Sequence, residues 1–235
     1  MEYLWTEDSG AGFHFWQLLN QHIFNNRFIV ESKKDNQKLL DAVEALTFPL
    51  ENTYYIAFDH IADNTDIMIK YARLQKCAAN SGGKIILLDV KSFEYFILAF
   101  EKLIAWTGTG KKDKIKIREE ILAAIVTYSL KVELIEDKMT LQYLARFNKA
   151  STEKVIKSLV SELTQNEKWS VNGQYMGECW FRDCCVSDYP GSVRCGNPSE
   201  KLGNEKMLAL FHSKALEPIL RQLNPCADAT MNLFT

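Results

Sequence analysis

The stretch that decides the fold is Tyr54-Tyr55-Ile56-Ala57-Phe58-Asp59, an apolar run of strand length that ends on a carboxylate. Three similar runs lie in the first ninety residues, and each is also followed by an acidic residue. An apolar run of four to eight residues between polar boundaries is typical of a buried strand. We therefore expect strands near residues 2–6, 27–31, 53–58 and 84–88.

Helical patterns separate these four runs. Apolar residues recur every three or four positions at 13–24, 35–46, 64–79 and 92–106, as in helices with one buried face. Asp35 is placed to cap the second of them. Strands that alternate with helices form right-handed crossovers and a parallel sheet with helices on both faces. The predicted fold class is α/β for residues 1–107.

The acidic residues at the strand ends suggest a function. Glu7, Asp59 and Asp89 each follow a strand-like run, and the carboxyl ends of parallel strands lie along one edge, where ligands bind. Carboxylates gathered there repel one another unless a proton or a cation separates them. Mg²⁺ is commonly held by a few carboxylates. The alternative is that these acids begin solvated loops or cap helices.

The polar, glycine-containing stretch Thr107-Gly108-Thr109-Gly110-Lys111-Lys112-Asp113-Lys114 is the best domain boundary. It is followed by a mainly helical second domain, predicted over residues 113–225. Helices are expected there near 114–132, 140–147, 152–165 and 205–223.

Residues 139–178 have the outline of a winged helix-turn-helix, with two short helices and then a strand-like ribbon. That outline is weakly specific. Lys154 and Lys157 could contact phosphates, but Glu153 and Glu162 on the same helix argue against base readout. A module for packing against a protein partner or for homo-oligomer formation remains an alternative.

Composition excludes several classes of protein. The net charge of -2 gives no global basic field. The beginning of the chain does not look like a secretory signal, and no apolar stretch approaches the length of a membrane span. Six cysteines in such a chain indicate free thiols or metal ligands rather than disulfides. We expect a cytoplasmic protein that does not insert into membranes.

Four of the cysteines, Cys179, Cys184, Cys185 and Cys195, lie close together in the sequence. Thiolates at short spacings on turns are typical of structural zinc sites, and His212 could add a fourth ligand. Adjacent side chains seldom reach one metal, however, so a group of buried thiols is the alternative to a Zn²⁺ site.

Three segments carry a family resemblance: the first strand through Glu7-Asp8 with the helix at Phe13, residues 56–64 around Asp59, and residues 87–96 around Asp89. Together they resemble the TOPRIM fold, in the variant of OLD-family nucleases and related phage-defence proteins. The resemblance covers under half of the chain.

This resemblance implies Mg²⁺- or Mn²⁺-dependent phosphoryl transfer on nucleic acid, either DNA or RNA, most plausibly strand cleavage. Glu7 would then act as general base or metal ligand. Asp59 and Asp63 would hold one or two metal ions, with Asp89 and Glu94 as further candidate ligands.

His60 would serve as a proton shuttle because its ordinary pKa lies near neutrality, and Lys33, Lys34 and Lys91 would neutralise phosphates. The sequence departs from the family at Ile61, since the family aspartates are normally two residues apart. This departure supports a second hypothesis, a non-catalytic TOPRIM-like module that binds nucleic acid, a nucleotide or a protein. A small-molecule α/β enzyme that uses Asp59 or His60 is a third.

Overall fold

The computed structural model describes residues 1–9, 11–103, 112–147, 151–164 and 210–225. Its centre is a four-stranded, all-parallel sheet in the order β2-β1-β3-β4, which confirms the α/β class. The strands are β1 (Glu2–Thr6), β2 (Ile29–Ser32), β3 (Thr53–Ala57) and β4 (Ile85–Leu87).

The strand order reverses at β1. The chain passes from β1 to β2 on one side, and β3 then pairs with β1 on the other side. The carboxyl ends of β1 and β3 therefore form the topological switch point, the place at which open α/β sheets bind ligands. Thr6 is level with Ala57 in the register of this pair, so the residues that leave the two strands emerge side by side.

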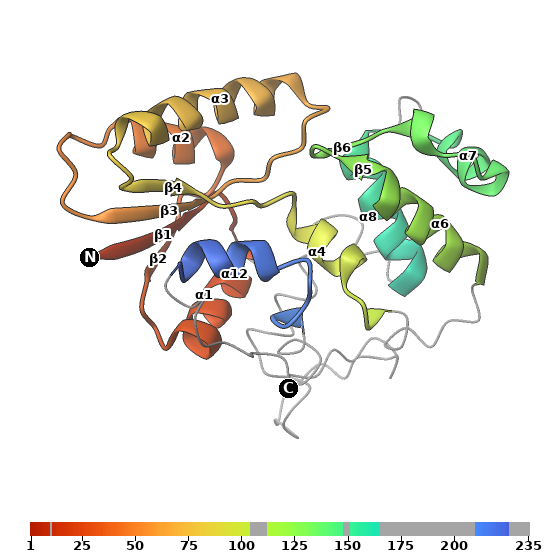
Figure 1. The fold of residues 1–235 in the computed structure, drawn as a ribbon, viewed down its shortest axis with the longest axis horizontal. Helices are drawn as coiled ribbons and strands as arrows, with labels where there is room; N and C mark the ends of the chain where they lie inside the picture. The colour runs from red at the N-terminus through yellow and green to blue at the C-terminus, as the bar shows by residue number, and fades with distance from the viewer. Residues whose placement is uncertain (10, 104–111, 148–150, 165–209, 226–235) are drawn as a thin grey trace.

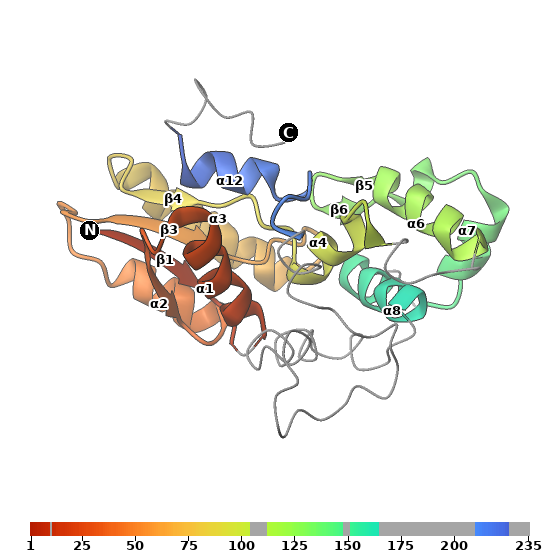
Figure 2. The ribbon, with the colours of Figure 1, turned by 90° about the horizontal axis from the view of Figure 1, so that it is seen from below.

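Both faces of the sheet are covered by helices. Figures 1 and 2 show α1 (Ala11–Phe24) and α12 (Glu217–Leu223) on one face and α2 (Asn36–Glu44) and α3 (Thr65–Asn80) on the other. Side chains alternate along a strand, so Leu4 belongs to the core under α1 and Trp5 to the core under α2 and α3.

Hydrogen-bonding caps begin the helices that follow β2, β3 and β4. Asp35 accepts from the main-chain N–H of Lys38 and starts α2, which confirms the predicted cap. Asn64 does the same for α3, and Ser92 for α4 (Phe93–Ala99). These caps fix where the chain turns back from the carboxyl edge of the sheet.

The second half is mainly helical in the part that the structure describes. It contains α6 (Lys112–Ala124), β5 (Ile125–Val126), β6 (Ser129–Leu130), the 3-10 helix η1 (Val132–Leu134), α7 (Lys138–Leu144) and α8 (Thr152–Thr164). The prediction of one helix over 114–132 was wrong beyond Ala124. Thr127 and Tyr128 have φ of 48° and 65°, the positive values that a two-residue hairpin turn requires.

Two other helices are shorter than predicted. α4 ends at Ala99, where the chain leaves the helical conformation at Phe100. α12 begins only at Glu217, because the chain turns over Phe211–Leu216 and Pro218 then sits in the first helical turn.

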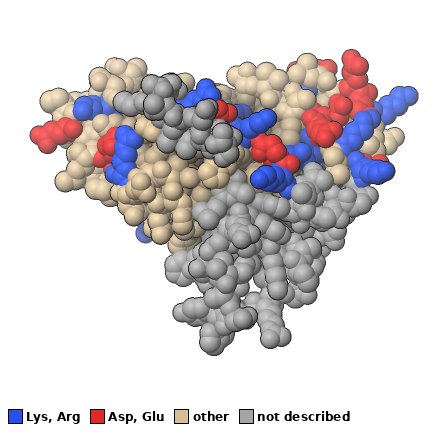
Figure 3. Space-filling view, turned by 60° about the horizontal axis from the view of Figure 1, so that its bottom comes forward, with Lys and Arg blue, Asp and Glu red and all other residues tan. Residues whose placement is uncertain are grey.

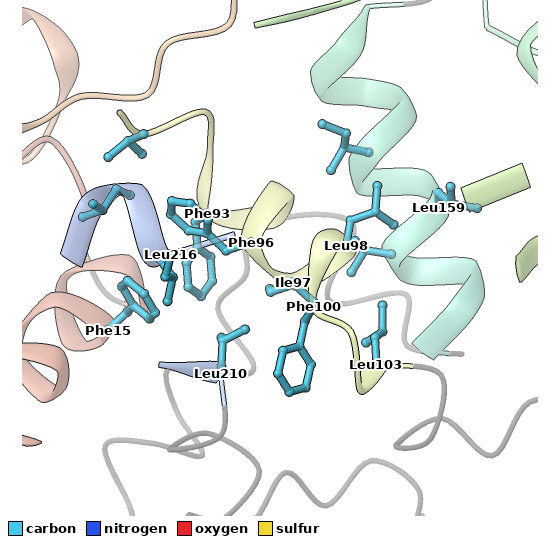
Figure 4. Close-up of a cluster of buried hydrophobic side chains, with 14 of the residues drawn as sticks. Phe15, Phe93, Phe96, Ile97, Leu98, Phe100, Leu103, Leu159, Leu210 and Leu216 are labelled. Carbon is cyan, nitrogen blue, oxygen red and sulfur yellow. The ribbon is translucent and has the colours of Figure 1, made fainter. Parts of the chain in front are cut away.

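Helix α4 joins the two halves through one continuous hydrophobic cluster. Figure 4 shows Phe93 and Phe96 beside Phe15 and Leu216, and Leu98 beside Leu159 of α8. The cluster continues from the sheet through α4 to α6, α7 and α8. Residues 107–111 of the predicted boundary lie outside the described residues, and its last three residues, 112–114, already belong to α6, so the division into two domains stays a prediction.

The ribbon of the predicted winged helix and Cys179, Cys184, Cys185 and Cys195 all lie outside the described residues. The possible zinc site is therefore still a prediction. Among the helices that the structure describes, none combines the length and apolar character needed to cross a bilayer.

Candidate functional site

The ends of β1 and β3 are tied together by Glu7. Its Oε1 accepts a hydrogen bond of 2.6 Å from the main-chain N–H of Asp59. Both residues are half-buried, and burial disfavours the charged form of each carboxyl group. The structure thus brings Glu7 and Asp59 together at the switch point of the sheet.

Glu7 resists ionisation in this position. Burial raises its pKa to about 8, and the neighbouring Asp8 carboxylate adds to the effect. The hydrogen bond from Asp59 and the charge of Lys70 act in the opposite direction. A carboxyl group with such a pKa can exchange a proton near neutral pH.

Asp8 is a site residue that the sequence prediction left out. Its Oδ2 accepts from Thr6 Oγ1 at 2.7 Å and from Trp16 Nε1 at 2.9 Å. Gly12 leaves room for this carboxylate, since a Cβ at that position would lie 2.3 Å from Asp8 Oδ1. Burial raises the pKa of Asp8, although both hydrogen bonds lower it. The adjacent pair Glu7-Asp8 was the signal in the sequence.

Asp59 is surrounded by negative charge. Burial raises its pKa well above the usual range, and repulsion from Glu7, Asp8 and Glu94 raises it further. Lys157 of α8 opposes this shift. We call Glu7, Asp8, Asp59 and Glu94 the carboxylate cluster.

Glu94 and Lys157 complete this environment from two different helices. Glu94 lies in the first turn of α4 and is 8% exposed. Burial raises its pKa, while Lys157 lowers it from a Nζ–Oε1 distance of 3.6 Å. Lys157 also pairs with Glu153 at 2.6 Å. The Lys157 ammonium thus acts on both Glu94 and Asp59.

The structure places Asp63 elsewhere. Its Oδ2 accepts a 2.6 Å hydrogen bond from the main-chain N–H of Thr152, the first residue of α8. The charges that act most strongly on Asp59 are those of Glu7, Asp8, Glu94 and Lys157. The sequence prediction grouped the two aspartates, but the chain turns between them and directs Asp63 to the helix.

His60 and Asp89 also belong to a different environment. The His60 ring is 5% exposed and stacks on Tyr71 and Tyr128, with centroid distances of 3.4 and 4.1 Å. Burial lowers its pKa, with Asp89 opposing and Lys91 adding to that effect. The charges that act on His60 are thus not those that act on Asp59. The main-chain N–H of Asp89 donates to Gln222 Oε1 of α12 at 2.8 Å.

The predicted phosphate-binding lysines have mixed surroundings. Lys33 pairs with Glu31 at 2.6 Å and lies 3.7 Å from the Trp5 ring centroid, while Lys34 is exposed. Lys91 lies 5.3 Å from the ring centroid of Tyr128. On the face shown in Figure 3, basic and acidic side chains are interspersed, so attraction for a polyanion would be local rather than global.

Within the described ranges, no three His, Cys, Asp or Glu side chains form a group that could hold a metal ion as they stand. The donor chemistry of the carboxylate cluster nevertheless suits a hard divalent cation, because carboxylate oxygens are its preferred ligands. These carboxyl groups repel one another when ionised, and a bound cation would reduce that repulsion. In the structure, the Glu7 carboxyl group accepts a hydrogen bond from the Asp59 N–H, and that of Asp8 accepts one from the Trp16 indole.

Comparison of the chain with protein-family models, with curated proteins and with solved structures gives no match.

Proposed function

We propose that the protein is a divalent-metal-dependent phosphodiesterase of TOPRIM type that cleaves nucleic acid. One observation carries the proposal: Glu7 after β1, Asp59 after β3 and Glu94 of α4 lie near enough for their charges to act on one another or on Asp8, and burial and repulsion raise the pKa of each. Strongly shifted pKa values in neighbouring titratable groups are typical of functional sites.

The carboxylate cluster supplies hard oxygen ligands, and Mg²⁺ or Mn²⁺ are the cations that these residues would hold. A cation bound there would polarise the scissile phosphate and stabilise charge on its oxygens. Glu7, Asp8 and Asp59 are the candidate ligands nearest to the sheet edge, and Glu94 approaches from α4.

Two residues have distinct roles in this proposal. Glu7 accepts a proton from the attacking water, because a base works best when its pKa lies near the working pH. Lys157 contacts the phosphate group, since its ammonium lies beside Glu94 and its charge reaches Asp59. His60 is left out of this chemistry because its ring is stacked between two tyrosines.

The test is a cleavage assay with labelled DNA and RNA, with and without Mg²⁺ or Mn²⁺. The wild-type protein should cleave at least one substrate only with metal, and Asp59→Asn should lose at least 100-fold in rate, as is usual when a metal ligand or charged catalytic group is lost. Asp113→Asn, at an exposed position on α6, is the matched control and should cleave normally. Metal-independent cleavage, or full activity in Asp59→Asn, would refute the proposal.

A second candidate is a non-catalytic TOPRIM-like module that binds nucleic acid or a protein. It is favoured by Ile61 and by the hydrogen bond that engages the Asp63 carboxylate with the first residue of α8. In the same assay, binding that is independent of metal and unaccompanied by cleavage would support this module.

A further inference from the structure

Asp63 connects the loop after β3 to the beginning of α8. Its carboxylate accepts from the N–H of Thr152 over a separation of 89 residues in sequence. Ser151 Oγ accepts from Lys154 N at 3.3 Å, which is the usual arrangement of an N-cap. The first N–H groups of a helix have no partner within the helix. Asp63, in the loop after β3, accepts the hydrogen bond from the Thr152 N–H.

Two more hydrogen bonds close the same junction. The main-chain N–H of Ala62 donates to Tyr128 O at 3.0 Å, and Leu130 N donates to Thr152 Oγ1 at 2.8 Å. Hydrogen bonds thus join the loop after β3 to the β5–β6 hairpin, and the hairpin to the start of α8. This arrangement fixes the position of the start of α8 relative to Asp59.

The position of α8 determines where a positive charge lies. Lys157 is five residues beyond Thr152 on the same helix, and its Nζ is 3.6 Å from Glu94 Oε1. Lys157 lowers the pKa of both Glu94 and Asp59. A shift or fraying of the first turn of α8 would move this ammonium away from the carboxylate cluster.

We infer that Asp63 is a positioning residue: by binding the first N–H of α8, it holds Lys157 against the carboxylate cluster. The consequence for catalysis rests on the proposed function, whereas the effect on Lys157 does not. Asp63 therefore acts on the cluster through a helix and not as a ligand of a shared cation.

Four variants separate this role from other roles of the same residues. Asp63→Ala removes the acceptor, and Asp63→Asn keeps a neutral acceptor of the same shape. Thr152→Pro removes the donor at the first helical position, where proline is well tolerated. Thr152→Val keeps the N–H and loses only the hydroxyl that binds Leu130.

The first readout is the rate at which an amine-directed reagent modifies Lys157, followed by mass spectrometry, with Lys154 on the same helix as the internal reference. Asp63→Ala and Thr152→Pro should both raise the relative reactivity of Lys157, by roughly three- to tenfold if the contact is worth as much as a typical cap. Asp63→Asn and Thr152→Val should stay close to the wild type. Far-UV circular dichroism checks that each variant folds, and if Asp63→Ala does not, the two Thr152 variants carry the comparison.

The second readout is kcat/KM for metal-dependent cleavage, in which Asp63→Ala and Thr152→Pro should fall together. Unchanged Lys157 reactivity in both variants would overturn the inference. So would loss of Mn²⁺ binding in Asp63→Ala with normal binding in Thr152→Pro, because Asp63 would then be a ligand. If the wild type cleaves nothing but Lys157 responds as expected, the proposed function fails and the positioning role stands.

Discussion

The main-chain N–H of Asp59 lies 2.6 Å from Oε1 of Glu7, and this hydrogen bond joins the ends of the two central strands. It spans 52 residues of sequence and closes the switch point of the sheet. The bond holds the Glu7 carboxylate next to Asp59. The two acidic groups therefore repel each other unless a cation or a proton neutralises part of their charge.

The charge on Glu7 should limit stability in alkaline solution without divalent metal. The folded-state pKa of Glu7 is raised from 4.5 to about 8, so its contribution to the free energy of unfolding is full below pH 4.5 and is lost as pH rises through 8. Glu7→Gln keeps the acceptor oxygen for Asp59 N–H and removes the charge. In a chelating buffer at pH 8.5, urea denaturation should show it to be more stable than wild type by roughly 1–3 kcal/mol, after allowance for partial exposure.

Glu51→Gln is the matched control, because Glu51 is exposed just before β3. Its free energy of unfolding should change by less than about 0.5 kcal/mol. A Glu7→Gln protein that is less stable than wild type at pH 8.5 would show that the Glu7 charge is compensated in the fold.

Gly12 is expected to be required for the position of Asp8. In Gly12→Ala the new Cβ would meet Asp8 Oδ1 at 2.3 Å, so the carboxylate must move away from Trp16 and Thr6. We expect Mn²⁺ affinity to fall at least roughly tenfold, the size of effect typical of losing support for a ligand. In the Asp8→Gly background all three contacts disappear, including the one with Asp8 Cβ, so Gly12→Ala should then have little further effect; independent, additive effects would argue against this contact.

Asn20 tests the fold without reference to function. Its buried side chain donates to Phe28 O and accepts from Phe28 N, each at 3.0 Å. Asn20→Leu leaves both main-chain groups without their partner and should cost about 2–4 kcal/mol of the free energy of unfolding. Gln21→Leu, at an exposed position on the same helix, should change it by less than about 0.5 kcal/mol.

The rate of metal-dependent cleavage should rise with pH. Protons compete with a cation for the cluster, because the pKa values of Glu7 and Asp59 are both raised. Activity at subsaturating Mg²⁺ should therefore be low near pH 6 and rise toward pH 8, with the midpoint moving to lower pH as Mg²⁺ is increased. A rate that is independent of pH over this interval at low Mg²⁺ would contradict the assignment of these carboxyl groups as ligands.

The sequence predicted the strands well because each is a short apolar run that ends on a polar residue. Glu7 and Asp59 could be grouped because parallel strands end on the same edge. Asp63 and His60 could not be placed in this way, since their positions depend on the turn after β3 and on partners from α8 and the hairpin, Thr152 and Tyr128.

The hairpin itself was missed for a local reason. Thr127 and Tyr128 adopt positive φ without a glycine, so the usual sequence signal of a tight turn is absent. Asp8 was not among the predicted site residues, since the space that Gly12 leaves for its carboxylate exists only in the folded chain.

The most direct test of the central claim is a calorimetric titration of the metal-free protein with Mn²⁺ at about pH 7, below the pKa of Glu7. The wild type should bind with release of protons, because the carboxyl groups of Glu7 and Asp59 hold protons that a cation must displace. Asp59→Asn should lose most of the affinity, while Glu51→Gln should match the wild type. Equal Mn²⁺ binding by wild type and Asp59→Asn, or no binding by the wild type, would contradict the account.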